Sequence, residues 1–128
     1  MVITWTYANR IAFHIPHYAW VEDKLVSIDY ETFKKAVLEF LTEHKVNGAY
    51  SFPATGYYKG RKYDEEILTV YTDTSVMAEV TSSYGNLCDQ FKAEMMQEAF
   101  AVEVNGQMLI YDDFVKNFAK GLQIEQDI

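Results

Sequence analysis

The residues with the clearest binding chemistry lie in segment 56–63, between two glycines and a run of carboxylates. Its candidate binding residues are Tyr57, Tyr58, Lys59, Arg61, Lys62 and Tyr63. Tyrosine rings stack on flat ligands or pack against proteins, while lysine and arginine pair with carboxylates or phosphates. An ordinary exposed hairpin also uses cations to discourage edge pairing. A protein-contact patch, a single-stranded nucleic-acid site and a plain exposed hairpin therefore all remain open.

Histidines and carboxylates supply the other reactive groups. His14 and His17 lie three residues apart, but Pro16 between them breaks regular geometry, and a zinc site needs three or four converging ligands. Residues 64–66, Asp-Glu-Glu, could act as paired carboxylates or hold a divalent cation, but no typical loop spacing surrounds them. We therefore predict no metal site and no cofactor, and we interpret 64–66 as a solvated entrance to a strand.

Cys88 is the only cysteine, so the chain can form no internal disulfide, which fits a reducing compartment. It falls on the inner stripe of a predicted helix, where we expect it to be buried and unreactive. No stretch approaches the roughly 18–20 apolar residues that cross a bilayer. No export leader is recognisable in the first twenty residues. The sequence therefore predicts a soluble cytoplasmic protein without membrane contact.

The charge is negative overall and unevenly distributed. The net charge is -8 over 128 residues, and residues 64–128 hold three Lys or Arg against thirteen Asp or Glu. Residues 1–63 are nearly neutral, with eight against six. Because phosphates would be repelled on average, we expect nucleic acid to be an unfavourable partner. Hydrophobic residues make up 49% of the chain, which predicts a folded core.

These groups must be positioned by two predicted helices. Asp29 is expected to cap a helix that runs to about residue 46, with apolar residues three and four apart and an end at Asn47-Gly48. A second helix is expected over 75–95, starting near Thr74. A short third helix is expected to begin at residue 112 or 113 and end at Gly121.

The predicted strands precede and follow these helices along the chain. Alternating residues predict strand structure over 3–15, either as one bulged strand or as two short ones, ended by Pro16. Segments 49–59 and 66–72 form a hairpin around Gly60-Arg61-Lys62, with Pro53 placing the first at an edge or bulge. A last hairpin joins 99–104 to 107–111.

This order predicts one α+β domain over residues 1–122, followed by a loose acidic tail over 123–128. The expected core is a ferredoxin-like βαββαβ unit, with two helices on one face of a mainly antiparallel sheet. A C-terminal hairpin strand and a short helix are added to it. The other sheet face is left open to solvent, a ligand or a partner.

The central hairpin also carries a family resemblance. Residues 56–60, Gly-Tyr-Tyr-Lys-Gly, followed by the alternating strand Glu66 to Val70, resemble small uncharacterised bacterial and phage proteins of ferredoxin-like build. The resemblance covers residues 48–104. It implies a ferredoxin-like fold and transfers no activity or catalytic residue, since that family has no established activity.

Three functions follow as hypotheses. The leading one is a non-enzymatic accessory protein, such as a phage-type inhibitor, that contacts another protein or a second copy of itself through the open sheet face and 56–63. Large aromatics at Trp5, Tyr7, Tyr50 and Tyr71 favour a homodimer. The alternative is a dimeric α+β barrel enzyme or small-ligand binder, with His14, His17 or tyrosines lining its pocket. The third is single-stranded nucleic-acid binding by the hairpin.

Overall fold

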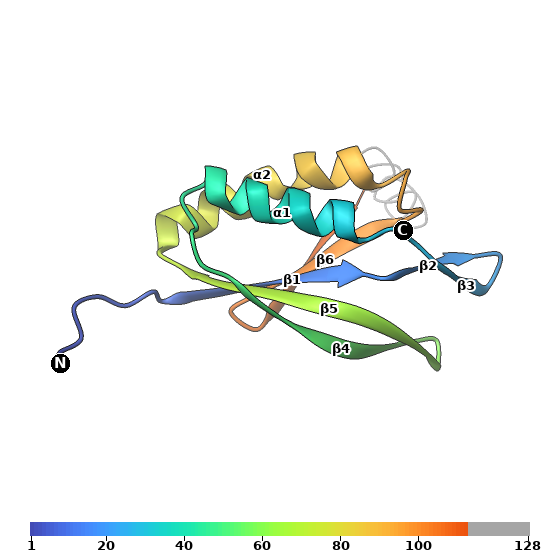
Figure 1. The fold of residues 1–128 in the computed structure, drawn as a ribbon, viewed down its shortest axis with the longest axis horizontal. Coiled ribbons are helices and arrows are strands. Elements are labelled where there is room, and N and C mark those ends of the chain that lie inside the picture. Colours follow the sequence, from blue (N-terminus) through green and yellow to red (C-terminus); the bar gives the residue numbers. More distant parts are fainter. Residues whose placement is uncertain (113–128) are drawn as a thin grey trace, which may run out of the picture.

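The computed structural model describes residues 1–112, so the expected third helix and acidic tail lie outside the described residues. Seven strands and two helices follow one another along this part of the chain (Figure 1). They are β1 (Asn9–Pro16), β2 (Tyr18–Val21), β3 (Lys24–Ser27), α1 (Glu31–Glu43), β4 (Tyr50–Tyr58), β5 (Arg61–Thr72), α2 (Thr74–Phe91), β6 (Ala99–Val104) and β7 (Gln107–Asp112).

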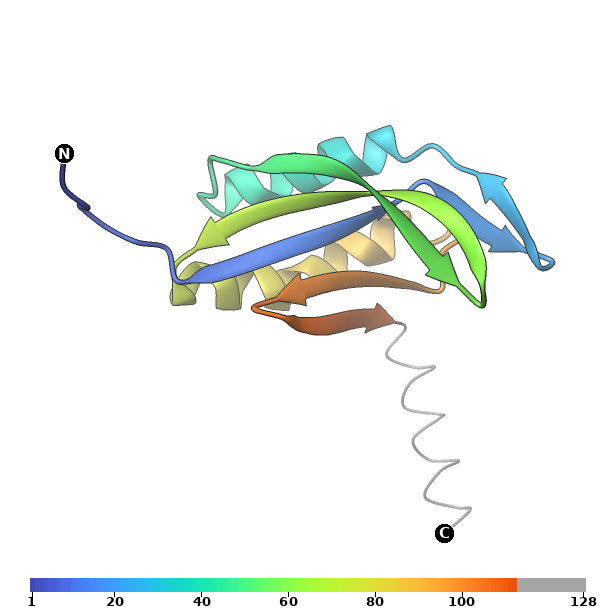
Figure 2. The same ribbon diagram turned by 90° about the horizontal axis from the view of Figure 1, so that it is seen from below.

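One antiparallel sheet carries the fold. Its five strands follow the order β4-β5-β1-β6-β7, and β2 pairs with β3 in a separate hairpin. Both helices lie against the same face of the large sheet (Figure 1), and Figure 2 shows the other face uncovered. The predicted α+β class, with two helices and a mainly antiparallel sheet, is confirmed.

The core lies between this sheet and the helices. Alternate residues of β1 point toward the helices, because side chains along a strand alternate between its two faces, and Ile11, Phe13 and Ile15 are fully buried. Phe33 of α1 packs edge-on against Phe91 at a centroid distance of 5.3 Å. Burying one such side chain contributes about 1.5–3 kcal/mol. The apolar side chains of this face therefore hold the sheet and the two helices together.

The first strand starts later than its sequence pattern suggests. We predicted strand structure from residue 3, but β1 begins at Asn9, and residues 1–8 have no regular secondary structure. Asn9 pairs with Thr72, where β5 ends, so earlier residues have no neighbouring strand with which to form ladder hydrogen bonds. Trp5 therefore remains 71% exposed despite its apolar ring.

Helix boundaries differ by a few residues from those predicted. Tyr30, not Asp29, occupies the N-cap of α1, although the Asp29 carboxylate accepts hydrogen bonds from the Glu31 amide and the Thr32 hydroxyl. The chain leaves α1 through Lys45, at φ +65°, before reaching the predicted Asn47-Gly48 stop. At α2, Asp73 accepts a hydrogen bond from the Val76 amide at 2.8 Å. Neither described helix is long and apolar enough to span a membrane.

The central hairpin forms as predicted, but its turn is tighter. Two residues with positive φ, Lys59 and Gly60, connect β4 to β5, so Arg61 and Lys62 already belong to the returning strand. Such a two-residue turn matches the natural twist of the flanking strands. Pro53 lies on β4, which is an edge strand of the sheet, as predicted.

Cys88 is buried on α2, which confirms its predicted structural position. Burial raises the pKa of its thiol to about 12, so almost no thiolate exists at neutral pH. We expect the native protein to resist a thiol-specific reagent at pH 8 and to react fully once unfolded in denaturant. Absorbance of the released chromophore measures both rates, and rapid reaction of the native protein would contradict this placement.

Candidate functional site

A hollow of about 420 Å³ lies beside the β4–β5 pair and the link between β1 and β2. We call it the Glu65 hollow; it is lined by His17, Pro53, Ala54, Thr55, Asp64 and Glu65. The strand register accounts for this grouping, since Ala54 pairs with Glu65 and Thr55 with Asp64. Its volume lies within the roughly 300–1,000 Å³ typical of small-molecule sites.

Glu65 is the most shielded carboxylate of this hollow. Its side chain is 12% exposed, and its Oε1 lies 3.2 Å from Nδ1 of His14, whose side chain is 22% exposed. A carboxylate removed from water is costly unless a partner compensates the lost hydration. The Glu65–His14 pair therefore places a partnered negative charge at the edge of a ligand-sized space, where it can bind a cation or exchange a proton.

His17 contributes a second polar group to the same hollow. Its ring stacks on Tyr30, with centroids 3.6 Å apart and planes 13° from parallel. Its Nε2 is buried and has no hydrogen-bond partner among the described residues. Buried polar atoms without partners are rare in folded proteins and often mark a place that a ligand or water completes. His17 is thus a candidate ligand-binding or acid–base group.

The neighbouring carboxylate Glu66 has a different role. Successive strand residues point to opposite faces, and Glu66 forms an ion pair of 2.7 Å with Lys34 of α1, on the helix-covered side. Hydrogen bonding to Glu66 raises the pKa of Lys34. The interpretation of 64–66 as a solvated strand entrance is therefore wrong for its last two residues, because these positions lie inside β5 between two neighbouring strands.

Tyr63 borders Glu65 because Gly56 leaves room for its ring. A Cβ atom added at Gly56 would lie 2.2 Å from Cζ of Tyr63, which no side chain could tolerate without moving the ring. Burial, and then the negative charge of Glu65, raise the pKa of Tyr63. The glycine of the hairpin thus positions a neutral phenol beside the carboxylate.

The Gly56–Tyr63 contact can be tested by substitution. We expect Gly56→Ala to displace the Tyr63 ring and to lower stability by about 1–3 kcal/mol, the usual cost of overpacking. Urea unfolding, followed by circular dichroism, measures this loss. Gly48→Ala is the matched control, because no atom lies within 4 Å of a Cβ built there. Equal stabilities of the two variants would refute the proposed contact.

The remaining hairpin residues are exposed but differ in the contacts they make with neighbouring elements. Tyr57 is 70% exposed, but the Tyr58 ring lies 5.7 Å from that of Trp20. Arg61 lies 5.4 Å from the Trp20 ring centroid and pairs with Asp23 at 3.3 Å. Lys59 lies 5.4 Å from the Tyr58 ring centroid, and Lys62 is exposed. Two of the six predicted residues, Tyr58 and Arg61, therefore contact the β2–β3 hairpin.

Comparison of the fold gives clear matches to solved enzymes. A phage SAM lyase in its apo state matches with a TM-score of 0.58 and 15% sequence identity, covering 89% of this chain and 96% of that one. A phage SAM lyase in complex with S-methyl-5'-thioadenosine matches with a TM-score of 0.57 and 11% identity, covering 88% and 97%. No protein-family model and no curated protein matches the chain. These likenesses show a shared fold.

The comparison corrects the leading functional hypothesis. A non-enzymatic inhibitor that works by protein–protein contact is contradicted by the two phage SAM lyase structures that match most of this chain, one of them with a bound small molecule. The prediction of a protein partner or a homodimer is contradicted by the same comparison. The alternative hypothesis, an enzyme or small-ligand binder with His14 or His17 at its pocket, fits these findings better.

Sequence reasoning had named His14, His17 and residues 64–66 but could not bring them together. The missing information was the register: β1 and β4 flank β5, and this order places both histidines near Glu65. One signal was available in the sequence, since adjacent carboxylates in a strand cannot all face the same side of the sheet. Among residues 1–112, no group of three or more His, Cys, Asp or Glu is placed to hold a metal ion.

Proposed function

We propose that this protein is an enzyme that binds S-adenosylmethionine in the Glu65 hollow and cleaves it. Two considerations support the proposal. The fold is shared over most of its length with phage SAM lyases, one of them in complex with S-methyl-5'-thioadenosine. The observation that carries the proposal for this chain is the shielded Glu65–His14 pair at the edge of a ligand-sized hollow.

The charges of this hollow suit such a substrate. S-adenosylmethionine carries a positive sulfonium and a positive ammonium group, and either can pair with a carboxylate. Glu65 and Asp64 both line the hollow, while the nearby Lys34 is engaged by Glu66 on the helix-covered side. Tyr63, a neutral phenol next to Glu65, does not itself line the hollow. The hollow therefore attracts a cationic ligand, because no lysine or arginine among its lining residues would repel one.

The reaction needs one bond to break. Cleavage between the sulfonium sulfur and the four-carbon amino-acid chain leaves both electrons on sulfur, which becomes the neutral thioether of S-methyl-5'-thioadenosine. If a proton leaves the amino-acid chain in the same step, a base must accept it. Glu65, which lines the hollow, is our candidate for this base, whereas Nε2 of His17 is buried and could act only if its ring turned toward the substrate. If the substrate's own carboxylate displaces the sulfur, these groups need only hold the substrate in position.

The finer features of the fold and hairpin belong to this proposal. The order β4-β5-β1-β6, with every neighbouring pair antiparallel, supports assignment of the core as ferredoxin-like βαββαβ. Within segment 56–63, we assign Tyr63 the role of supporting Glu65, which it neighbours. Tyr58 and Arg61 contact the β2–β3 hairpin, and Tyr57, Lys59 and Lys62 are exposed and available to a ligand.

Binding calorimetry tests the proposed recognition of charge. We expect S-adenosylmethionine to bind more tightly than S-adenosylhomocysteine, its neutral thioether analogue, because only the former offers a sulfonium to the Glu65 hollow. The difference should disappear in Glu65→Gln. Equal affinities for the two compounds in the wild-type protein, or an unchanged preference in Glu65→Gln, would contradict the proposal.

A further inference from the structure

The Glu65 hollow lies where two hairpins leave the body of the protein. β1 ends at Pro16, which pairs with Glu65, so beyond this point β5 has only β4 beside it within residues 1–112. The hairpin of β2 and β3 starts just after Pro16, and no third described strand pairs with it. Both hairpins project from the same end of the sheet (Figure 1 and Figure 2). Because isolated two-stranded hairpins are at best marginally stable in water, each needs outside contacts to keep its position.

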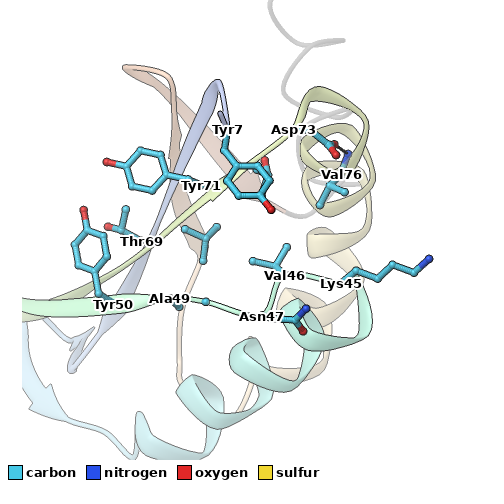
Figure 3. A pocket seen from close by; sticks show the side chains of 13 residues that line it. Tyr7, Lys45, Val46, Asn47, Ala49, Tyr50, Thr69, Tyr71, Asp73 and Val76 are labelled. Atoms are coloured by element: carbon cyan, nitrogen blue, oxygen red, sulfur yellow. Dashed lines mark hydrogen bonds between the residues drawn. The ribbon is translucent and has the colours of Figure 1, made fainter. Parts of the chain in front are cut away.

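The two hairpins supply different walls of the hollow. His17, at the base of β2, forms one wall, and the lining residues of β4 and β5 form the other. A second cavity, of about 560 Å³, differs in this respect. It lies between Tyr50 and Tyr71 of the sheet and Val76 of α2, elements that the hydrophobic core holds together (Figure 3). The width of the Glu65 hollow, unlike that of this cavity, therefore depends on how the two hairpins are held.

The base of the β2–β3 hairpin is fixed to the rest of the protein. The Ile28 amide donates a hydrogen bond to the His17 carbonyl at 3.1 Å, and the Gln97 side chain donates one to the Tyr18 carbonyl, also at 3.1 Å. Beyond this base, the structure describes every residue of β2, β3 and their turn, and among them Ala19 alone is buried. Little apolar surface therefore holds the outer part of this hairpin in place.

Contacts between the two hairpin tips supply further support. The Arg61 guanidinium donates hydrogen bonds to the carbonyl and the carboxylate of Asp23, the latter at 3.3 Å. Its Cζ atom lies 5.4 Å from the centroid of the Trp20 ring, and that ring lies 5.7 Å from the ring of Tyr58. We call these four residues the tip clasp. The clasp and the pairing of β1 with β5 join the two hairpins at two places, which fixes the walls of the hollow relative to each other.

We propose that Trp20 and Arg61 are positioning residues, whose clasp keeps the two walls of the Glu65 hollow at the separation that its ligand requires. This role rests on the proposed function in that it takes the hollow as the ligand site. A ligand binds only the fraction of molecules whose site is correctly formed, so the apparent Kd rises in proportion as that fraction falls. Once bound, the ligand itself holds the walls together, and the chemical step keeps its ordinary rate.

Arginine suits position 61 because of its shape as well as its charge. Its planar guanidinium has donors for two oxygens of Asp23 and a flat face for the Trp20 ring, whereas lysine offers one compact ammonium group. The ion pair is exposed on both sides, so each contact is weak. Their joint loss corresponds to about a three- to tenfold change in an equilibrium constant. Arg61→Lys, which keeps the charge, therefore separates the clasp from a role of charge alone.

Calorimetry and turnover with S-adenosylmethionine test the effect on the ligand. We expect Arg61→Lys and Arg61→Ala to raise both Kd and KM about three- to tenfold, while kcat stays within about twofold of the wild-type value. Lys24→Ala is the matched control, because it removes an exposed cation from the same hairpin outside the clasp. If Arg61 acted by charge alone, Arg61→Lys would bind as the wild type does, and Arg61→Ala would bind more tightly. Either result would overturn the inference.

Hydrogen exchange followed by mass spectrometry tests the clasp on the full chain without any ligand. We expect peptides from 18–27 and 53–65 to exchange about three- to tenfold faster in both Arg61 variants than in the wild type, and at the wild-type rate in Lys24→Ala. Unchanged exchange in 53–65 would refute the clasp whether or not S-adenosylmethionine binds. Faster exchange in a protein whose wild type neither binds nor cleaves this compound would refute only the proposed function and would support the clasp.

Discussion

Glu65→Gln is expected to reduce the cleavage of S-adenosylmethionine by about 10²–10⁴-fold, the usual range for loss of an acid–base group. Glutamine keeps the shape of the side chain but can neither attract the cationic substrate nor accept a proton at neutral pH. The pairing with His14, at 3.2 Å, is weakened by the same change. Release of S-methyl-5'-thioadenosine under saturating substrate measures the effect.

Glu39→Gln is the matched control for this prediction. Glu39 is exposed on α1, away from the residues that line either cavity, so its replacement should leave turnover unchanged. Circular dichroism establishes whether both variants keep the wild-type fold. A folded Glu65→Gln protein with undiminished turnover would remove Glu65 from the proposed mechanism.

Lys34→Met is expected to destabilise the fold by about 1–3 kcal/mol, because Glu66 would keep its charge in a shielded position without a partner. The pair is short, at 2.7 Å, and the Glu66 side chain is only 17% exposed. Lys35→Met is the control, since Lys35 is exposed and helix propensities of Lys and Met are nearly equal. Urea unfolding compares the two variants, and equal losses would refute the role of the ion pair.

The pH dependence of this stabilisation has a definite sign. Glu66 raises the pKa of Lys34 above its ordinary 10.5, so the folded protein holds that proton more tightly than the unfolded chain does. The contribution is therefore complete below pH 10.5 and lost as pH rises through the raised pKa. The stability difference between wild type and Lys34→Met should therefore shrink as pH rises into the alkaline range. A difference that vanished near neutral pH would contradict this assignment.

Local patterns predicted the elements that fix the sheet. The alternation around Phe13, the helical spacing of Val80, Tyr84 and Cys88, and the position of Pro53 at a sheet edge all reflect short-range chemistry that one sequence contains. The predicted start of a strand was wrong where pairing with a strand distant in the sequence decides it. Residues 1–8 alternate like a strand, but β5 ends at Thr72 and offers them no ladder.

The candidate site could not be assembled from the sequence for a similar reason. His14 and Glu65 are 51 residues apart, and only the antiparallel register of β1 with β5 brings them to 3.2 Å. The predicted binding role of the hairpin residues stays a prediction. The sequence could not show that Trp20 and Asp23 lie against Tyr58 and Arg61, because these contacts join segments that are distant along the chain.

Direct assay of the purified protein with S-adenosylmethionine tests the proposed function most sharply. Liquid chromatography with mass spectrometry quantifies S-methyl-5'-thioadenosine over time against a sample without protein. We predict product that grows in proportion to protein concentration and to time. A rate equal to that of the sample without protein, measured with folded wild-type chain, would contradict the assignment of this protein as an S-adenosylmethionine-cleaving enzyme.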